Sequence, residues 1–280
     1  MLPNLIIIGA MKCGTTSLHF YLSLHPEVQM SKLKELDFFA ERYNWSKGFK
    51  WYESNFLEQP EKCIYGESSP NYTNCTLSPE VPRRMHDLVP DAKLIYVVRN
   101  PIERMQAHYI HKISNGSETR EINDAFFDIQ SERYFPRSLY YSQLERYLEY
   151  YPLSQILIVT TEDLRNHRQQ TLQKIFDFLE VNPNFYSHLY NLERHKSRTK
   201  RRKNELGQKI AQSTLGKAID ELPNSSTRRL IKEIIYYPFS TTVSEPTLKP
   251  ELIAFLKEQL RDDVNKLRQL TGRQFSSWSV

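Results

Sequence analysis

The chain has 280 residues and a mass of 33.3 kDa, enough for one large α/β domain or two small ones. With 39% hydrophobic and 25% charged residues, it is neither a disordered chain nor a collagen-like or repeat fibre. Its net charge is +5, yet residues 194–203 alone carry seven Lys and Arg side chains. Charge concentrated in one segment predicts a discrete anion as ligand and no nucleic acid, since nucleic-acid binders more often spread it over a face. A solvated loop or a localisation signal is the alternative.

The longest apolar run, Leu5 to Met11, is far shorter than the ~20 residues that a membrane span needs, so we expect no span. Met1 is followed by no basic region and no signal cleavage site. An odd number of cysteines without CxxC spacing argues against a disulfide framework or a zinc site and favours the cytoplasm. Five Asn-x-Ser/Thr sequons leave a lumenal domain of a longer precursor as the alternative.

The first predicted element is a strand over residues 4–9 (NLIIIG), because a continuous apolar run is typical of a strand buried on both faces of a parallel sheet. A helix is predicted directly after it, over residues 15–24, with apolar side chains at helical spacing. The His25-Pro26 pair ends this helix, since the residue before proline is disfavoured in the α region.

Later apolar runs predict three more strands, over residues 63–66, 93–99 and 155–160. Amphipathic patterns predict three more helices, over residues 138–151, 169–180 and 249–270, with Gly272 capping the last. Short strands that alternate with helices predict an α/β fold in three layers, with a central parallel sheet flanked by helices. No repeat or linker divides the sequence, so we expect one domain over residues 1–280.

The loop between the first strand and the first helix reads GAMKCGTT over residues 9–16. Backbone N–H groups and the helix dipole make such a loop an anion site suited to phosphate. The GxxxxG spacing is that of a P-loop, but Thr15-Thr16 replace the usual Lys-Ser/Thr pair and the lysine lies inside the loop, at Lys12. Strand 93–99 ends in Arg99, where a P-loop NTPase would place a metal-binding Asp. We therefore expect no metal and no Mg²⁺-dependent triphosphate chemistry.

Three segments carry a family resemblance: AMKCGTTSL, LIYVVRNPIERMQAHY and LRQLTGRQFSSW. They resemble the sulfotransferases that use 3′-phosphoadenylyl sulfate (PAPS), especially the heparan and carbohydrate branch and its bacterial relatives. The resemblance implies in-line transfer of a sulfuryl group from PAPS to a hydroxyl or amine, without a metal, and release of 3′,5′-bisphosphoadenosine (PAP). The acceptor is expected to be a small molecule, a saccharide or a carrier-bound group.

For the donor nucleotide, the resemblance implicates the first motif at the 5′-phosphosulfate and Arg99 at the 3′-phosphate. The residues of the first motif are Lys12, Cys13, Gly14, Thr15, Thr16 and Ser17. Lys12 is the candidate catalytic cation, because it would stabilise the charge that develops as PAP leaves. Ala107 replaces a serine that is usual in the family at the 3′-phosphate, and the basic segment with Lys196, Ser197 and Arg198 is expected to close over the nucleotide.

For the acceptor, the segment Lys-Glu-Leu-Asp-Phe-Phe is similar to one in heparan-type enzymes, which implies Glu35 as the catalytic base. We expect Phe38 and Phe39 to form an apolar wall that raises the pKa of Glu35. An exposed Glu35 paired with a neighbouring lysine, or a histidine base, is the alternative. The segment GESSPNY implies acceptor contacts from Ser69, Asn71 and Tyr72, but Ser68 stands where heparan enzymes usually have a lysine.

Two alternatives to a sulfotransferase remain at this point. A P-loop kinase would require Mg²⁺ and is disfavoured by the missing Gly-Lys-Thr. A noncatalytic module that binds a nucleotide or a glycan would bind without turnover and would tolerate Glu35→Gln.

Overall fold

A computed structural model describes the chain except residues 57–58, 60–62, 193–200, 222–230, 233 and 244–245. Contacts between Cα atoms divide the chain into two compact units. Unit 1 consists of Met1–Met105, Asp128–His195 and Pro250–Val280, and unit 2 of Gln106–Phe127 and Lys196–Lys249. The single domain expected over residues 1–280 stays a prediction, since a compact unit and an independently folding domain are different properties.

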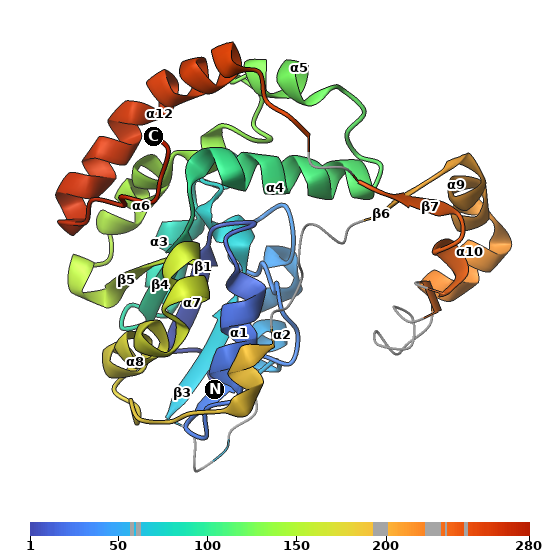
Figure 1. The fold of residues 1–280 in the computed structure, drawn as a ribbon. Coiled ribbons are helices and arrows are strands. Elements are labelled where there is room, and N and C mark those ends of the chain that lie inside the picture. The colour runs from blue at the N-terminus through green and yellow to red at the C-terminus, as the bar shows by residue number, and fades with distance from the viewer. Residues whose placement is uncertain (57–58, 60–62, 193–200, 222–230, 233, 244–245) are drawn as a thin grey trace. The chain divides into compact units, whose positions relative to one another are not determined.

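Within the described residues, unit 1 is built on a five-stranded parallel sheet in the order β2-β3-β1-β4-β5 (Figure 1). The strands are β1 (Leu5–Gly9), β2 (Val28–Met30), β3 (Ile64–Ser68), β4 (Lys93–Val98) and β5 (Ile156–Thr160). The predicted parallel sheet is therefore confirmed, and so are its four predicted strands. Strand β2 was not predicted, because its three residues are too few to form a recognisable apolar run.

Helices flank the sheet of unit 1 on both faces, which confirms the predicted three-layer fold (Figure 1). They are α1 (Thr15–Ser23), α2 (Gly48–Glu53), α3 (Val81–Leu88), α6 (Tyr140–Leu148), α7 (Thr161–Asn166), α8 (Arg168–Leu179) and α12 (Pro250–Thr271). Short 3₁₀ helices are η1 (Trp45–Lys47), η2 (Pro70–Thr73), η3 (Pro136–Ser138), η4 (Leu153–Gln155) and η5 (His188–Asn191). In the described part of the chain, no helix has both the length and the apolar character needed to cross a bilayer.

The core of unit 1 explains why the strands could be recognised in the sequence. All five residues of β1 are buried, and β4 is buried from Leu94 to Val98. A central parallel strand has helices over both faces, so it needs apolar side chains at consecutive positions. Tyrosine rings from α6, including those of Tyr140 and Tyr147, complete this core.

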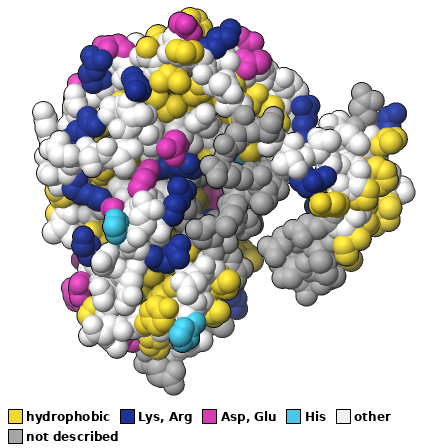
Figure 2. Space-filling view, viewed as in Figure 1, with side chains coloured by type: hydrophobic (Ala, Val, Ile, Leu, Met, Phe, Trp, Pro, Cys, Tyr) yellow, Lys and Arg dark blue, Asp and Glu magenta, His cyan; other side chains and the backbone are white. Residues whose placement is uncertain are grey.

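Unit 2 contains short elements. Helix α4 (Pro101–Ser114) enters it at Gln106, and the other elements are α5 (Ile122–Phe127), β6 (Arg201–Lys203), α9 (Glu205–Gln212), α10 (Thr214–Asp220) and β7 (Ser240–Thr242). Strands β6 and β7 pair antiparallel, with Arg201 opposite Thr242. Unit 2 exposes the apolar side chains of Leu206, Leu215, Ile234 and Tyr237 (Figure 2).

The topology of unit 1 gathers four segments at one edge of the sheet. Parallel strands all end at the same edge, so the residues that follow β1, β3, β4 and β5 lie there. In doubly wound sheets of this kind, ligands bind outside the carboxyl ends of the strands. We therefore expect the functional site at this edge of the sheet.

Candidate active site

The loop after β1 is shaped mainly by its own backbone. The Ala10 N–H donates to the Val97 carbonyl at 2.7 Å, and the Cys13 N–H donates to the Ala10 carbonyl at 3.2 Å. Gly14 is left-handed, with φ 91°, and caps α1, a conformation that favours glycine. A Cβ atom on Gly9 would lie 1.9 Å from the Thr73 Oγ1, so only glycine fits at the end of β1. Both glycines of the GxxxxG pattern are thus explained by the backbone.

The first turn of α1 presents donors to an anion. The Ser17 and Leu18 N–H groups donate to the Gly14 carbonyl, so the Thr15 and Thr16 N–H groups come before the first helical hydrogen bonds. This first turn carries no acidic residue. Lys12 lies in the same loop and is left-handed, with φ 71°. The Thr15 and Thr16 N–H groups, their two hydroxyls and one ammonium fit the phosphosulfate end of a nucleotide.

The Cys13 side chain attaches the loop to the core of unit 1. Its side chain is fully buried, with the Sγ 3.6 Å from the Tyr140 hydroxyl oxygen, and burial raises the pKa of the thiol to about 11. The Cys13 carbonyl accepts a hydrogen bond of 2.7 Å from the Thr161 hydroxyl. The structure therefore gives Cys13 a packing role, and its backbone remains part of the phosphate loop.

The segment after β4 places Arg99 at the carboxyl edge of the sheet, as predicted. Its guanidinium donates to Glu103 at 2.7 and 3.1 Å, and 18% of its side-chain surface is exposed. The Asn100 N–H donates to the Glu162 carboxylate at 3.0 Å, and the Asn100 Oδ1 accepts from the Ile102 N–H at 3.1 Å. These bonds fix the start of α4 and leave Arg99 partly open to a ligand.

Arg104 follows Glu103 in α4, and its side chain is completely buried. It donates to the Ser138 hydroxyl at 2.6 Å and to the Tyr134 carbonyl at 2.5 Å. One helical position separates Glu103 from Arg104, and this rotation turns the first side chain outward and the second inward.

The predicted basic segment cannot be placed at the nucleotide, because Lys196, Ser197 and Arg198 lie outside the described residues. The assignment of these three residues to the nucleotide stays a prediction. Ala107, at the position of the serine usual in the family, is buried in α4, within unit 2.

The turn at residues 35–38 is the second part of the site. Glu35 and Asp37 are both left-handed, with φ 64° and 45°, which costs a residue other than glycine about 1–3 kcal/mol. The Glu35 N–H donates to the Ser68 carbonyl at 3.0 Å, so the turn lies against the end of β3. The charges of Lys34 and Glu35 act on His19 of α1, whose pKa is lowered to about 4, mainly by burial.

The side chain of Glu35 is not enclosed as expected. Half of it, 51%, is exposed, and its Oε1 pairs with the Lys34 ammonium at 2.6 Å. Phe38 and Phe39 are buried, and they pack against Tyr52 in an aromatic cluster of the core. The predicted apolar wall around Glu35 is therefore wrong, because the two rings are buried in the core while half of the Glu35 side chain stays exposed.

The buried carboxylates of this region are Glu67 and Asp37 instead. Glu67 is fully buried at the end of β3, and burial raises its pKa to about 7 although three hydroxyl groups donate to it. Asp37 accepts a hydrogen bond of 3.0 Å from the Asn71 amide, and burial raises its pKa. The Asn71 Oδ1 in turn accepts from Arg137 at 3.2 Å. Burial lowers the pKa of Arg137 to about 10.

The three predicted acceptor residues fall into two groups. The hydroxyls of Ser69 and Tyr72 donate to Glu67, at 2.6 and 2.8 Å, so they point into the protein. Asn71 lies between Asp37 and Arg137, and Arg137 also reaches the Met11 sulfur at 3.7 Å. Asn71 is thus connected to the phosphate loop through Arg137.

Sequence reasoning missed Glu67, Asp37 and Arg137 as members of the site. An acidic residue at the carboxyl end of a buried strand is a signal for Glu67 that could have been used. Asp37 lies two residues after Glu35 and looked like an ordinary polar residue of a loop. For Arg137, which comes from the distant helix η3, the sequence offers no comparable signal.

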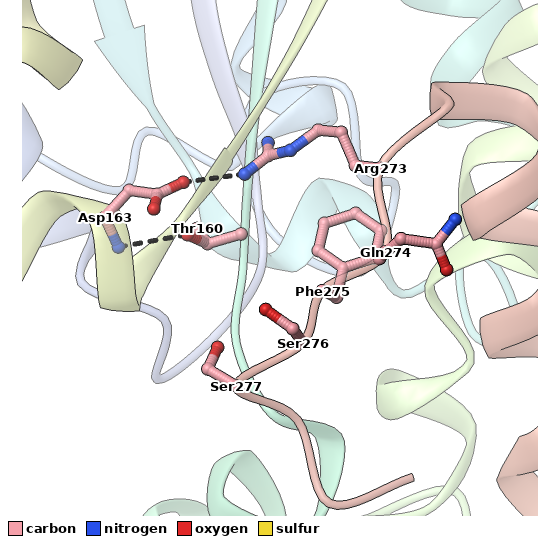
Figure 3. A pocket seen from close by; sticks show the side chains of 7 residues that line it. All are labelled: Thr160, Asp163, Arg273, Gln274, Phe275, Ser276 and Ser277. Atoms are coloured by element: carbon pink, nitrogen blue, oxygen red, sulfur yellow. Dashed lines mark hydrogen bonds and ion pairs between the residues drawn. The ribbon is translucent and has the colours of Figure 1, made fainter.

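A separate cavity of about 300 Å³ lies where the C-terminal tail passes the end of β5 (Figure 3). Its lining residues are Thr160, Asp163, Arg273, Gln274, Phe275, Ser276 and Ser277. Arg273 pairs with Asp163 at 2.6 Å and also donates to the Ile158 carbonyl, so its charge is compensated. These contacts attach the tail to unit 1. Within the described residues, no group of His, Cys, Asp and Glu side chains is arranged to hold a metal ion.

Comparisons with known proteins agree with this architecture. A sequence model of the family described as "Sulfotransferase domain" matches residues 2–233. The chain is 34% identical over 203 residues to the human bifunctional heparan sulfate N-deacetylase/N-sulfotransferase 2, which covers 65% of this chain and 22% of that protein. It is 30% identical over 207 residues to the mouse heparan sulfate glucosamine 3-O-sulfotransferase 5, which covers 68% of this chain and 56% of that protein. The alignments thus span between about a quarter and about half of these relatives.

Two solved structures share the fold. A sulfotransferase from Alicyclobacillus acidocaldarius superimposes with a TM-score of 0.73 at 22% identity, over 100% of both chains. A mouse sulfotransferase complexed with PAP superimposes with a TM-score of 0.51 at 14% identity, over 94% of this chain and 84% of that one. At these identities the likeness concerns the fold alone.

Proposed function

Because the chain belongs to the sulfotransferase domain family, whose general reaction is PAPS-dependent, we propose that it transfers a sulfuryl group from PAPS to a hydroxyl or amine of a saccharide. The observation that carries this proposal is the loop over residues 9–16, which places Lys12 and the open N-terminus of α1 at one edge of the sheet. Curated relatives named for heparan sulfate support a saccharide as acceptor.

The donor end of the reaction is assigned to the phosphate loop and Arg99. PAPS supplies the sulfuryl group and leaves as PAP. The Thr15 and Thr16 N–H groups bind the 5′-phosphate, and Arg99 exchanges its pair with Glu103 for the 3′-phosphate. The Lys12 ammonium stabilises negative charge beside the reacting bond. A sulfuryl group is less negative than a phosphoryl group, so side-chain cations suffice.

The acceptor end is assigned to the 35–38 turn. The Glu35 carboxylate takes the proton from the acceptor hydroxyl or amine as the acceptor attacks. Its partial exposure supports this role, because a base has to touch the substrate that it deprotonates. Ser68 is buried at the position of the usual lysine, so we propose an acceptor with less negative charge around the reacting group than a fully sulfated polymer.

The test is transfer of label from [³⁵S]PAPS to two matched polymers. De-N-sulfated heparan sulfate offers free amines, and its re-N-acetylated form offers only hydroxyls. Labelling of either polymer that is lost in Lys12→Ala supports the proposal, and the pattern distinguishes N- from O-sulfation. PAP binding by calorimetry without any labelling would favour the noncatalytic binding module, and Mg²⁺-dependent transfer from ATP would favour a kinase.

A further inference from the structure

A buried network joins Glu67 to the 35–38 turn. Among the described residues, three hydroxyls donate to the Glu67 carboxylate: Tyr52 to Oε1 at 2.6 Å, Tyr72 to Oε1 at 2.8 Å and Ser69 to Oε2 at 2.6 Å. All four side chains are buried. In its ionised form, a carboxylate that accepts three hydrogen bonds fixes the direction of all three hydroxyl groups.

Two of these hydroxyl groups also accept hydrogen bonds from the backbone of the 35–38 turn. The Phe38 N–H donates to the Tyr72 hydroxyl oxygen at 2.9 Å, and the Asp37 N–H donates to the Ser69 hydroxyl oxygen at 3.0 Å. A hydroxyl has a single proton, so donating it to Glu67 leaves its lone pairs to face these N–H groups. Each hydroxyl is therefore a relay between the carboxylate and one amide of the turn.

The turn requires such support because of its backbone. Two of its residues, Glu35 and Asp37, adopt the left-handed conformation that residues other than glycine avoid. The conformation of a strained turn persists only where its surroundings determine it. Here the N–H groups of Glu35, Asp37 and Phe38 all donate to the segment 68–72, at the carboxyl end of β3.

We propose that Glu67 is a positioning residue: it holds the 35–38 turn, and with it Glu35, through the Ser69 and Tyr72 hydroxyl relays. The inference rests on the proposed function, in which Glu35 takes the proton of the acceptor. Glu67 itself is fully buried and touches no substrate. In this proposal Ser69 and Tyr72 do not contact the acceptor as predicted. They act on catalysis indirectly, by holding the 35–38 turn.

The two tyrosines provide a matched pair for the test. Tyr52 and Tyr72 are both fully buried, and both donate to the Glu67 Oε1. The Tyr72 oxygen also accepts the Phe38 N–H, whereas no N–H of the turn, in the part of the chain that the structure describes, donates to Tyr52. Tyr52→Phe and Tyr72→Phe therefore remove the same bond to Glu67 but differ in the relay.

The experiment measures amide hydrogen exchange at residues 35–38 by NMR, together with kcat and the KM for PAPS on de-N-sulfated heparan sulfate. Tyr72→Phe and Ser69→Ala are expected to speed exchange at Phe38 and Asp37, respectively, about tenfold and to lower kcat about tenfold, with the KM for PAPS unchanged. Tyr52→Phe is expected to keep the exchange at Phe38 and the kcat of the wild type. Glu67→Gln keeps an acceptor oxygen for the tyrosines and should retain slow exchange at Phe38.

Equal effects of Tyr52→Phe and Tyr72→Phe on exchange and kcat would overturn the inference, because the network would then act only on general stability. Unchanged exchange in both Tyr72→Phe and Ser69→Ala would overturn it as well. The exchange measurement needs no substrate. A wild-type protein that labels no acceptor would contradict the proposed function, while the exchange pattern would still decide whether Glu67 holds the turn.

Discussion

The phosphate loop and the 35–38 turn lie at the same edge of one sheet but are held in different ways. The loop over residues 9–16 is shaped by its own glycines and by backbone bonds to the neighbouring strand β4. The turn is shaped by a segment more than thirty residues later, through one carbonyl and two hydroxyl groups. The donor end is thus held mainly through backbone conformation and backbone groups, whereas the acceptor end also depends on side-chain hydroxyls that tertiary folding brings to it.

This difference has a consequence for mutagenesis. Substitutions in the loop should change the binding or reaction of PAPS, because the loop residues contact PAPS directly. Substitutions around the turn should change deprotonation of the acceptor, even at residues that contact no substrate. Four experiments test this difference.

The largest effect is expected from Lys12→Ala. Loss of a positioned cation beside developing charge should lower kcat about 1,000-fold, while the thermal midpoint of unfolding stays unchanged because Lys12 lies in a partly exposed loop. The matched control is Lys32→Ala, an exposed loop lysine. Turnover close to that of the wild type in Lys12→Ala would remove this residue from the mechanism.

Glu35→Gln should have the next largest effect, about 100-fold on kcat, because the amide cannot accept the proton of the acceptor. Affinity for PAP, measured by calorimetry, should not change, since the base belongs to the acceptor end. Glu41→Gln alters another exposed carboxylate nearby and serves as the control. An unchanged rate in Glu35→Gln would redirect the search for the base to a histidine.

Arg99→Ala tests binding of the donor nucleotide and removes no group that acts on the reacting bond. It should weaken PAP binding about 30-fold through loss of a charged hydrogen bond, and leave the affinity for AMP, which lacks the 3′-phosphate, as it is. Arg83→Ala is a matched control, because Arg83 also pairs with an acid four residues later, at 2.9 Å. A wild-type protein with equal affinity for PAP and AMP would contradict the assignment of Arg99.

The smallest effect concerns stability and Glu67. Its pKa is raised from 4.5 to about 7 by burial, so between these values the folded protein holds a proton that the unfolded chain has lost. Stability should therefore fall as the pH rises through this window, by at most about 1.4 kcal/mol per pH unit. Glu67→Gln should remove that slope in urea unfolding at pH 5, 6 and 7, and Glu53→Gln, at an exposed site, should keep it. Parallel slopes in the wild type and Glu67→Gln would argue against a buried, titrating Glu67.

Much of the fold of unit 1 was predictable because its signals are continuous along the chain. The runs that became β1, β4 and β5 are apolar except for Lys93 at the start of β4 and Thr160 at the end of β5, as expected of strands covered on both faces. Helices α1, α8 and α12 begin and end within one or two residues of the predicted bounds, and Gly272 is left-handed, with φ 66°, as a cap requires. Strand β2 and the β6–β7 pair were not predicted, because three residues are too few to show a continuous or alternating apolar pattern.

The sequence alone was enough to identify the phosphate loop, the four longer strands of the sheet and the family to which the chain belongs, because these leave signals in residues that are neighbours in the chain. Tertiary structure decided which carboxylate is buried and which is exposed: Glu67 inside the network and Glu35 at the surface. The reason is physical, since burial and hydrogen bonding of a side chain depend on partners such as Tyr52, Ser69 and Tyr72 that only folding places around it.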